Sequence, residues 1–191
     1  MKNQLKNPYP LIMPAPAAVI AVASPESGDN LITLAWCGVA CSEPPQISIG
    51  ISTTNRHSYH IIRENPEFTV NIPGEDNLRA ADICGTTHGN CVDKWEKAGL
   101  TRAESAKISV PHIEEFPISL ECRVTERVEL GSHDLFVGEI LVTTLQESAV
   151  EGVRFDPSAI RPLAYLPKVG GYFGLDLSES RGDYGCSSGG E

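Results

Sequence analysis

The sequence lacks the phosphate-binding loops that mark several large enzyme classes. Its 191 residues contain no G-x-G-x-x-G dinucleotide fingerprint and no Walker loop of the G-x-x-x-x-G-K-[S/T] type. Rossmann-type dinucleotide enzymes and P-loop nucleotide hydrolases are therefore unsupported. Any phosphate that this chain binds must be held by a different arrangement of residues.

Positive charge is also scarce. Lys and Arg number 15 against 25 Asp and Glu, which gives a formal net charge of −10. A surface of this sign repels the phosphates of nucleic acids and anionic lipids, so we expect neither nucleic acid nor a membrane as a partner. Single basic residues become informative, because the field of the whole protein opposes phosphate binding.

No hydrophobic run reaches the roughly 20 residues that a membrane-spanning helix needs. The run at 11–23 follows two lysines and ends in Ala-Val-Ala, which resembles a secretory signal peptide. Pro14 and Pro16 interrupt it where a signal helix would form, whereas 17–23 is a continuous stretch of Val, Ile and Ala. The run therefore predicts a first β-strand, and we expect a cytoplasmic protein.

The cysteines lack the spacing of common zinc sites, because none of the six forms a C-x-x-C pair. Cys37 and Cys41, together with Cys84, His88 and Cys91, are the candidate metal ligands, but their spacing favours no metal site. A chain of this length builds its own core without disulfides. We therefore expect reduced thiols in the cytoplasm.

The length fits one domain, which we place at 1–175. The remaining 176–191 are rich in Gly, Ser and charged residues, so we expect a disordered tail. No internal repeat or linker divides the domain.

Alternation of apolar residues with small or polar ones is the main pattern along the chain. In 46–52 three isoleucines face one side while Ser and Gly face the other, and in 68–72 Thr69 and Asn71 point outward between apolar neighbours. Further strands are predicted at 30–37, 117–130 and 133–145, the last two joined by a turn at 131–132. Short helices are predicted at 57–64, at 77–84 with Gly85 as its end, and at 94–98. This pattern favours a mainly β fold, a closed antiparallel barrel with a few short helices.

A polar turn around Arg56 is a candidate phosphate site. Arg56 lies in TTNRHS, between the strand 46–52 and the helix 57–64. Hydroxyl groups, the arginine charge and the free N–H groups of the helix start together suit a phosphate. An ordinary capped turn is the alternative. Ser48 and Gly50 leave room for a flat group against the preceding strand, which favours the phosphate site.

Three further residues have simpler explanations when the sequence is taken alone. Trp36 falls on a predicted strand, where a tryptophan is more often part of a core or an interface. Lys94 follows Asp93, a helix N-cap, and fits the first turn of an amphipathic helix. His133 lies at a hairpin turn, where solvent exposure is the usual state.

Taken in order, the segments of the chain resemble the flavin reductase-like FMN-binding split-barrel family, and within it the flavoredoxin branch. The resemblance rests on NLITLAWCGVACSEPPQISIGIS, RHSYHIIRENPEFTVNIP, AADICG, VDKWEKAGLT, SLECRV, LGSHDLFVGEI, PLAYL and GYFGL. It implies an FMN-binding split β-barrel and a homodimer whose flavin lies near the interface. Electrons would pass through the flavin from NAD(P)H or a protein donor to a flavin, ferric or protein acceptor.

The matching motifs also imply which residues approach the flavin, without naming a general base. Ser52, Thr54, Arg56 and Ser58 are expected at the ribityl chain and phosphate. The other implied contacts are Asn30, Leu34, Ala35, Trp36, Lys94, His133 and Phe173 or Tyr172. Because the Arg56 turn holds one terminal phosphate and offers no second site, FMN is expected rather than FAD. The alternatives are a non-catalytic FMN-binding electron carrier and a cofactor-free interaction scaffold.

Overall fold

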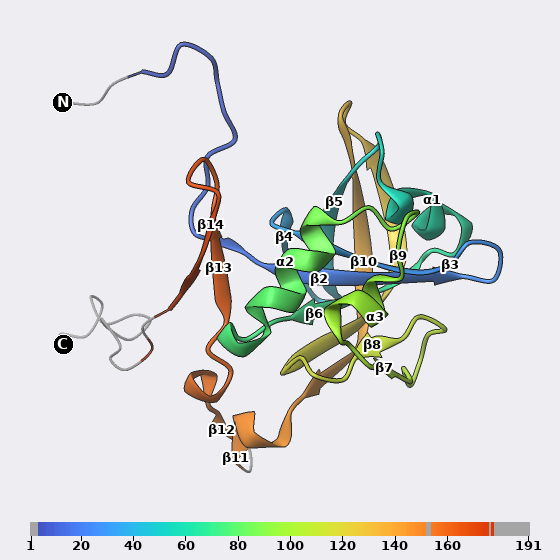
Figure 1. The fold of residues 1–191 in the computed structure, drawn as a ribbon, viewed down its shortest axis with the longest axis vertical. Coiled ribbons are helices and arrows are strands. Elements are labelled where there is room, and N and C mark those ends of the chain that lie inside the picture. The colour runs from blue at the N-terminus through green and yellow to red at the C-terminus, as the bar shows by residue number, and fades with distance from the viewer. Residues whose placement is uncertain (1–3, 152–153, 176, 178–191) are drawn as a thin grey trace.

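A seven-stranded antiparallel sheet forms the body of the protein (Figure 1). The computed structural model describes residues 4–151, 154–175 and 177. The strands lie in the order β3-β2-β6-β9-β10-β5-β4. Their bounds are Ala18–Ser24 for β2, Gly28–Leu34 for β3, Cys37–Ser42 for β4, Pro45–Ser52 for β5, Glu67–Ile72 for β6, Ile118–Glu129 for β9 and His133–Leu145 for β10. The predicted antiparallel, mainly β fold is confirmed.

The two edge strands of the sheet, β3 and β4, follow each other in the chain with only Ala35 and Trp36 between them. β4 folds back onto β5, and the amide of Gly50 in β5 donates to the carbonyl of Trp36 over 2.8 Å. The two edges therefore meet at this break, and the sheet closes into a barrel. The predicted strand 30–37 is wrong at its end, because β3 stops at Leu34 and Trp36 lies on no strand. No Gly or Pro marks the break, so the sequence carries no turn signal there.

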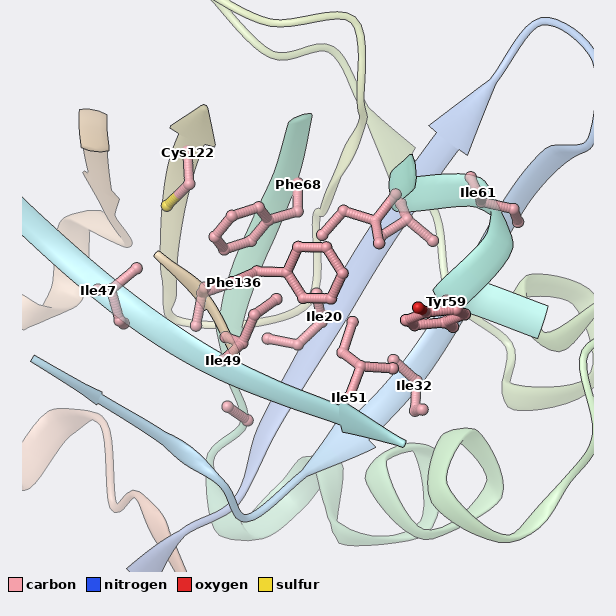
Figure 2. Packing of buried hydrophobic residues seen from close by; sticks show 14 residues of the cluster. Ile20, Ile32, Ile47, Ile49, Ile51, Tyr59, Ile61, Phe68, Cys122 and Phe136 are labelled. Carbon is pink, nitrogen blue, oxygen red and sulfur yellow. The ribbon is translucent and has the colours of Figure 1, made fainter. Parts of the chain in front are cut away.

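One hydrophobic cluster fills the inside of the barrel (Figure 2). The isoleucines of β5 point into it, as their alternation predicts, and Tyr59 and Ile61 reach it from α1. Its buried members are Ala18, Ile20, Val22, Ile32, Ile47, Ile49, Ile51, Tyr59, Ile61, Ile62, Phe68, Val70, Cys122 and Phe136. Burial of each large apolar side chain of this kind stabilises the fold by about 1.5–3 kcal/mol.

A second hydrophobic cluster covers the outer side of β2 and β3. Val19 and Ala21 of β2 and Leu31 of β3 pack there against Trp95 and the residues that follow it. The alternate residues of β2 face the barrel interior, so both faces of this strand are buried. Burial on both faces explains the unbroken apolar run at 17–23, and the strand prediction for it is confirmed.

The polar residues of β6 point out of the barrel as predicted, yet Thr69 and Asn71 are 0% exposed. The segment between α3 and β9 covers them. The Asn71 amide nitrogen donates to the Val19 carbonyl over 3.1 Å, and its Oδ1 accepts from the Ile113 amide at 3.0 Å and from the Ser119 hydroxyl at 2.8 Å. Asn71 therefore ties β2, β6, β9 and the covering segment together inside the protein.

Three short helices pack on the sheet. α1 stops at the residue before Asn65, as its Asn-Pro end predicts, and the Asp93 carboxylate caps α3 by accepting two backbone N–H groups. α2 runs through Gly85, which was predicted to end it. A Cβ at Gly85 would lie 3.1 Å from the Thr33 Cβ, so this glycine lets the helix approach β3 instead of ending the helix. The bounds are His57–Glu64 for α1, Leu78–Thr86 for α2 and Lys94–Ala98 for α3, and a 3₁₀ turn η1, Glu75–Asn77, precedes α2.

A small sheet lies beside the barrel, where the hairpin of β13 (Leu163–Leu166) and β14 (Gly171–Gly174) pairs with β1 (Ala15–Pro16) (Figure 1). The N-terminal arm extends away from the barrel past this hairpin. Large apolar side chains are exposed along both, namely Leu5, Tyr9, Leu11, Ile12, Met13, Val169, Phe173, Leu175 and Leu177. Such a collection of exposed apolar groups is typical of a surface that another chain covers.

The remaining elements are short. They are β7 (Arg102–Ala103), β8 (His112–Ile113), β11 (Val150–Glu151), β12 (Arg154–Phe155), η2 (Glu147–Ala149) and η3 (Pro157–Ala159). Within the described residues, no helix has the length and apolar character to cross a membrane. The tail predicted at 176–191 lies outside the described residues, apart from Leu177.

Candidate cofactor-binding site

The turn after β5 presents an arginine whose side chain has no partner among the described residues. Asn55 adopts a left-handed backbone with φ of 59°, and Arg56 follows it as the N-cap of α1 without any side-chain cap. Among the described residues, the half-buried Arg56 guanidinium has no hydrogen-bond or ion-pair partner. A positive charge and the free N–H groups of the first turn of α1 are therefore available to a ligand.

Trp36 and His133 form an aromatic wall near this turn. Their ring centroids lie 4.1 Å apart, and the Ser132 hydroxyl lies 2.9 Å from His133 Nδ1. Burial, aided by the charge of Arg56, lowers the pKa of His133. The space that the sequence predicted beside Gly50 is occupied, since a Cβ there would lie 3.3 Å from the Cβ of Trp36. Trp36 thus takes up part of the space along the small face of β5, while Gly50 and Ser52 still line a hollow beside it.

A groove runs along the end of β3 between this wall and the hairpin of β13 and β14. A hollow of about 130 Å³ is lined by Leu34, Ala35, Trp36, Ser52, Arg56 and His133 together with Ile32, Thr33 and Gly50. Leu34 and Ala35 also line a cavity of about 340 Å³ with Gly85, Tyr165 and Tyr172. The two hollows share Thr33, Leu34 and Ala35 and are therefore neighbours, and together they are called the groove between Tyr172 and Arg56.

Two buried polar interactions fix the backbone next to the groove. Lys94 is 3% exposed, and its Nζ donates to the Leu31 carbonyl over 2.6 Å and to the Cys84 carbonyl over 2.8 Å. Burial lowers the pKa of Lys94 to about 8. The Asn30 amide donates to the Ser58 hydroxyl over 2.8 Å, which links β3 to α1.

These features match a known domain over most of the chain. The model of the flavin reductase like domain matches residues 11–172. The chain belongs to this family. The predicted resemblance is therefore confirmed, and the groove described above lies within a flavin reductase-like domain.

Solved structures and relatives agree with this assignment. Flavoredoxin of Desulfovibrio vulgaris (Miyazaki F) superposes with a TM-score of 0.86 at 27% identity, over 95% of this chain and 97% of that one. Flavoredoxin from Methanosarcina acetivorans superposes with a TM-score of 0.84 at 26% identity, over 98% of this chain and 100% of that one. An uncharacterized protein of Archaeoglobus fulgidus is 35% identical over 150 residues, which cover 78% of this chain and 81% of that protein. The NADH:riboflavin 5'-phosphate oxidoreductase of Streptomyces pristinaespiralis is 34% identical over 96 residues, or 50% of this chain and 51% of the other.

The flavin reductase-like fold brings most of the predicted flavin contacts to one place. The groove between Tyr172 and Arg56 contains Leu34, Ala35, Trp36, Ser52, Arg56 and His133. Asn30, Ser58 and Lys94 line a narrow hollow of about 10 Å³ that also touches Arg56, but their polar groups contact the protein. Thr54 lines none of these hollows and lies 3.3 Å from Ser52 through its hydroxyl oxygen.

At the other end of the groove, the hairpin contributes Tyr172 and not Phe173. Phe173 is 44% exposed and lines none of these hollows. The rings of Tyr165 and Tyr172 lie 5.7 Å apart on paired strands, so both face the same side of the hairpin. Sequence reasoning missed Tyr165 and Thr33 as groove residues, although two-residue alternation along 171–174 separates Tyr172 from Phe173.

Two cysteines near the groove are not reactive thiolates. Cys37 begins β4 directly after Trp36, and Cys84 lies buried on α2. Burial raises the pKa of each thiol to about 12. Because the thiolate is the reactive form, neither side chain is suited to nucleophilic chemistry.

Proposed function

We propose that this protein is an FMN-dependent oxidoreductase that passes electrons through a flavin held in the groove between Tyr172 and Arg56. The observation that carries the proposal is Arg56, the N-cap of α1, which has no side-chain partner among the described residues and lies at one end of a groove that also contains the rings of Trp36, His133, Tyr165 and Tyr172. A flavin mononucleotide has the complementary shape, a planar ring at one end and a phosphate at the other.

The residues present suit that ligand. Arg56 supplies a charge-assisted hydrogen bond to a phosphate, and the N–H groups of the first turn of α1 supply further donors. Ser52 provides a hydroxyl on the path to the ring. Trp36 and Tyr172 supply apolar and aromatic surface for the ring.

FMN supplies reversible uptake of a hydride or of electrons when it is bound. The chain itself orients the ring and sets its electrostatic surroundings. Burial lowers the pKa of His133, which favours its neutral form, and a neutral imidazole can donate one N–H hydrogen bond without adding charge. Lys94 holds the backbone of β3 against α2, which fixes the floor of the groove.

The comparisons support the flavin but leave its electron donor open. Two similar structures are flavoredoxins, and the relative from Streptomyces pristinaespiralis is an NADH:riboflavin 5'-phosphate oxidoreductase. Riboflavin 5'-phosphate is the chemical name of FMN. We infer that NADH or NADPH reduces the bound flavin of this protein.

Cofactor identity and reduction can be tested on the purified protein. Denaturation is expected to release FMN, identified by mass spectrometry, and anaerobic stopped-flow mixing with NADH or NADPH is expected to bleach the flavin absorbance. Stoichiometric FAD would contradict the choice of FMN. A yellow protein that neither nucleotide bleaches would instead be an electron carrier, and a colourless protein that binds no added flavin would be a scaffold.

We also propose that the protein is a two-fold symmetric homodimer. The N-terminal arm and the hairpin of β13 and β14 carry many exposed apolar side chains, and we propose that a second copy covers them. Light scattering of the FMN-loaded protein is expected to report twice the mass of one chain. A monomer that retains FMN would contradict the dimer.

A further inference from the structure

Two buried polar residues that line neither hollow of the groove connect two of its walls. Tyr59 of α1 is 6% exposed and Asp134 of β10 is 2% exposed, and the Tyr59 hydroxyl donates to Asp134 Oδ2 over 2.8 Å. Tyr59 lies three residues after Arg56, and Asp134 directly follows His133. One hydrogen bond therefore joins the helix that begins next to Arg56 to the strand that begins at His133.

Arg127 keeps Asp134 charged. Its Nε donates to the same Oδ2 over 2.7 Å, and its Nη2 donates to the Tyr59 hydroxyl oxygen over 3.3 Å. An opposite charge at this distance favours the ionised carboxylate, and a charged acceptor forms a stronger hydrogen bond with the Tyr59 hydroxyl. Because burial of a carboxylate costs desolvation energy, we expect the network to add little net stability.

The turn that contains Arg56 is anchored at both ends. At its start, the Thr53 amide donates to the Ser132 carbonyl over 3.1 Å. At its end, the Tyr59 amide donates to the Arg56 carbonyl over 3.0 Å, and the Tyr59 side chain reaches Asp134. A short segment with both ends fixed has few conformations, so the position of Arg56 depends on these contacts.

Packing of the helix on the core does not replace the Tyr59 hydrogen bond. The Tyr59 ring lies in the barrel cluster and meets the Phe136 ring edge-on, with 6.2 Å between the centroids (Figure 2). Hydrophobic contacts are non-directional, so they hold the ring inside the barrel without fixing its position along β10. The hydroxyl bond is directional and does fix it. The bond from Asn30 to Ser58 ties the same turn to β3 and leaves its position relative to β10 open.

We propose that Tyr59 and Asp134 are positioning residues, which hold Arg56 where the flavin phosphate binds. The inference rests on the proposed function, which assigns that phosphate to Arg56. Neither side chain contacts the ligand. Tyr59 acts through the backbone of the turn, and Asp134 fixes Tyr59 to the strand that carries His133. The spacing between the phosphate end of the groove and its histidine wall is thus set from inside the protein.

The mildest test is Tyr59→Phe, which removes the hydroxyl group and keeps the ring in the core. We expect FMN binding to weaken about five- to tenfold, a usual effect within one hydrogen-bond network, and riboflavin binding, which involves no phosphate, to stay within about twofold. In the Arg56→Ala protein, the same substitution is expected to change FMN affinity by less than about twofold, because the residue through which Tyr59 acts is gone. Quenching of flavin fluorescence measures each affinity.

Ser119→Ala is the matched control. Ser119 is also 2% exposed, donates one buried side-chain hydrogen bond to Asn71 over 2.8 Å, and lines neither hollow of the groove. Its replacement is expected to lower the free energy of unfolding at least as much as Tyr59→Phe and to leave FMN affinity unchanged. The inference is overturned if Tyr59→Phe weakens FMN and riboflavin equally, if Ser119→Ala weakens FMN as much, or if the loss is the same with and without Arg56.

Two variants of Asp134 test the same contact from β10. Asp134→Asn keeps an oxygen that can accept from the Tyr59 hydroxyl, whereas Asp134→Ala keeps none. We expect the ratio of FMN to riboflavin affinity to be at least about threefold higher in Asp134→Asn, the effect of one retained hydrogen bond. Equal ratios in the two variants would count against the positioning role, whether or not Tyr59→Phe folds.

Hydrogen exchange of the flavin-free protein separates failure of this inference from failure of the proposed function, because it needs no ligand. The amide at position 59 is bonded to the Arg56 carbonyl. In Tyr59→Phe this amide is expected to exchange about tenfold faster through local opening, and in Ser119→Ala at the wild-type rate. Faster exchange in a protein that binds no FMN would support the positioning role and contradict the flavin proposal. An unchanged rate in Tyr59→Phe would overturn the positioning role.

Discussion

Replacing Arg56 with Ala is expected to weaken FMN binding by about ten- to a hundredfold. The substitution removes one charge-assisted hydrogen bond to the phosphate, a class of interaction that contributes about 1.5–3 kcal/mol. No partner of Arg56 within the described residues is left unsatisfied, so the thermal midpoint of the flavin-free protein is expected to stay unchanged. Titration by quenching of flavin fluorescence measures the affinity.

Two controls make the result specific. Riboflavin lacks the phosphate, so its weaker binding is expected to be insensitive to Arg56→Ala, whereas damage to the fold would weaken both ligands alike. Arg63→Ala removes the same charge from the last turn of α1, where Arg63 lies 5.6 Å from the Tyr59 ring, and is expected to leave FMN affinity unchanged. Equal losses for FMN and riboflavin, or no loss for FMN, would assign the phosphate to a residue other than Arg56.

Replacing Asn71 with Leu is expected to lower the free energy of unfolding by about 3–5 kcal/mol. The side chains are similar in volume, but leucine leaves the Val19 carbonyl, the Ile113 amide and the Ser119 hydroxyl without their partner in a buried region. Each unsatisfied buried group costs about 1–3 kcal/mol. Urea unfolding followed by circular dichroism measures the difference.

A second asparagine provides the comparison. Asn77 is partly exposed, and its Oδ1 accepts from the Gly74 amide at 3.0 Å as a cap of the η1 turn. Asn77→Ala is expected to cost only about 1 kcal/mol, the usual value for a lost cap. If Asn71→Leu proves no more destabilising than Asn77→Ala, then Asn71 does not hold the sheet and the segment between α3 and β9 together as the structure indicates.

Local sequence patterns were sufficient to predict most of the secondary structure. Two-residue alternation predicted the strand that contains Ile49, and the Asn-Pro and Asp93 signals predicted the ends of α1 and α3. These patterns succeed because they reflect backbone geometry within a few residues. The unbroken apolar run that became β2 was also assigned correctly, since its prolines precede the strand.

Features that depend on residues far apart in the chain could not be predicted from the sequence. The break at Trp36 is set by its pairing with Gly50, and the burial of Asn71 is set by the segment that lies over it. The groove residues Tyr165 and Thr33 come from separate sheets, and only the closed fold brings them together. Arg56 was found because a lone cation in a polar turn is a local signal.

The central position of β2 has a consequence for how the molecule opens. β2 pairs with β3 on one side and β6 on the other, and its two faces belong to different hydrophobic clusters. Because β2 stays paired and covered when only one cluster opens, we expect its amide hydrogens to exchange with solvent only when the whole domain unfolds. Arg56 belongs to neither cluster, so the turn that contains it has no such double protection. We expect the amide hydrogens of this turn to exchange while the barrel stays folded.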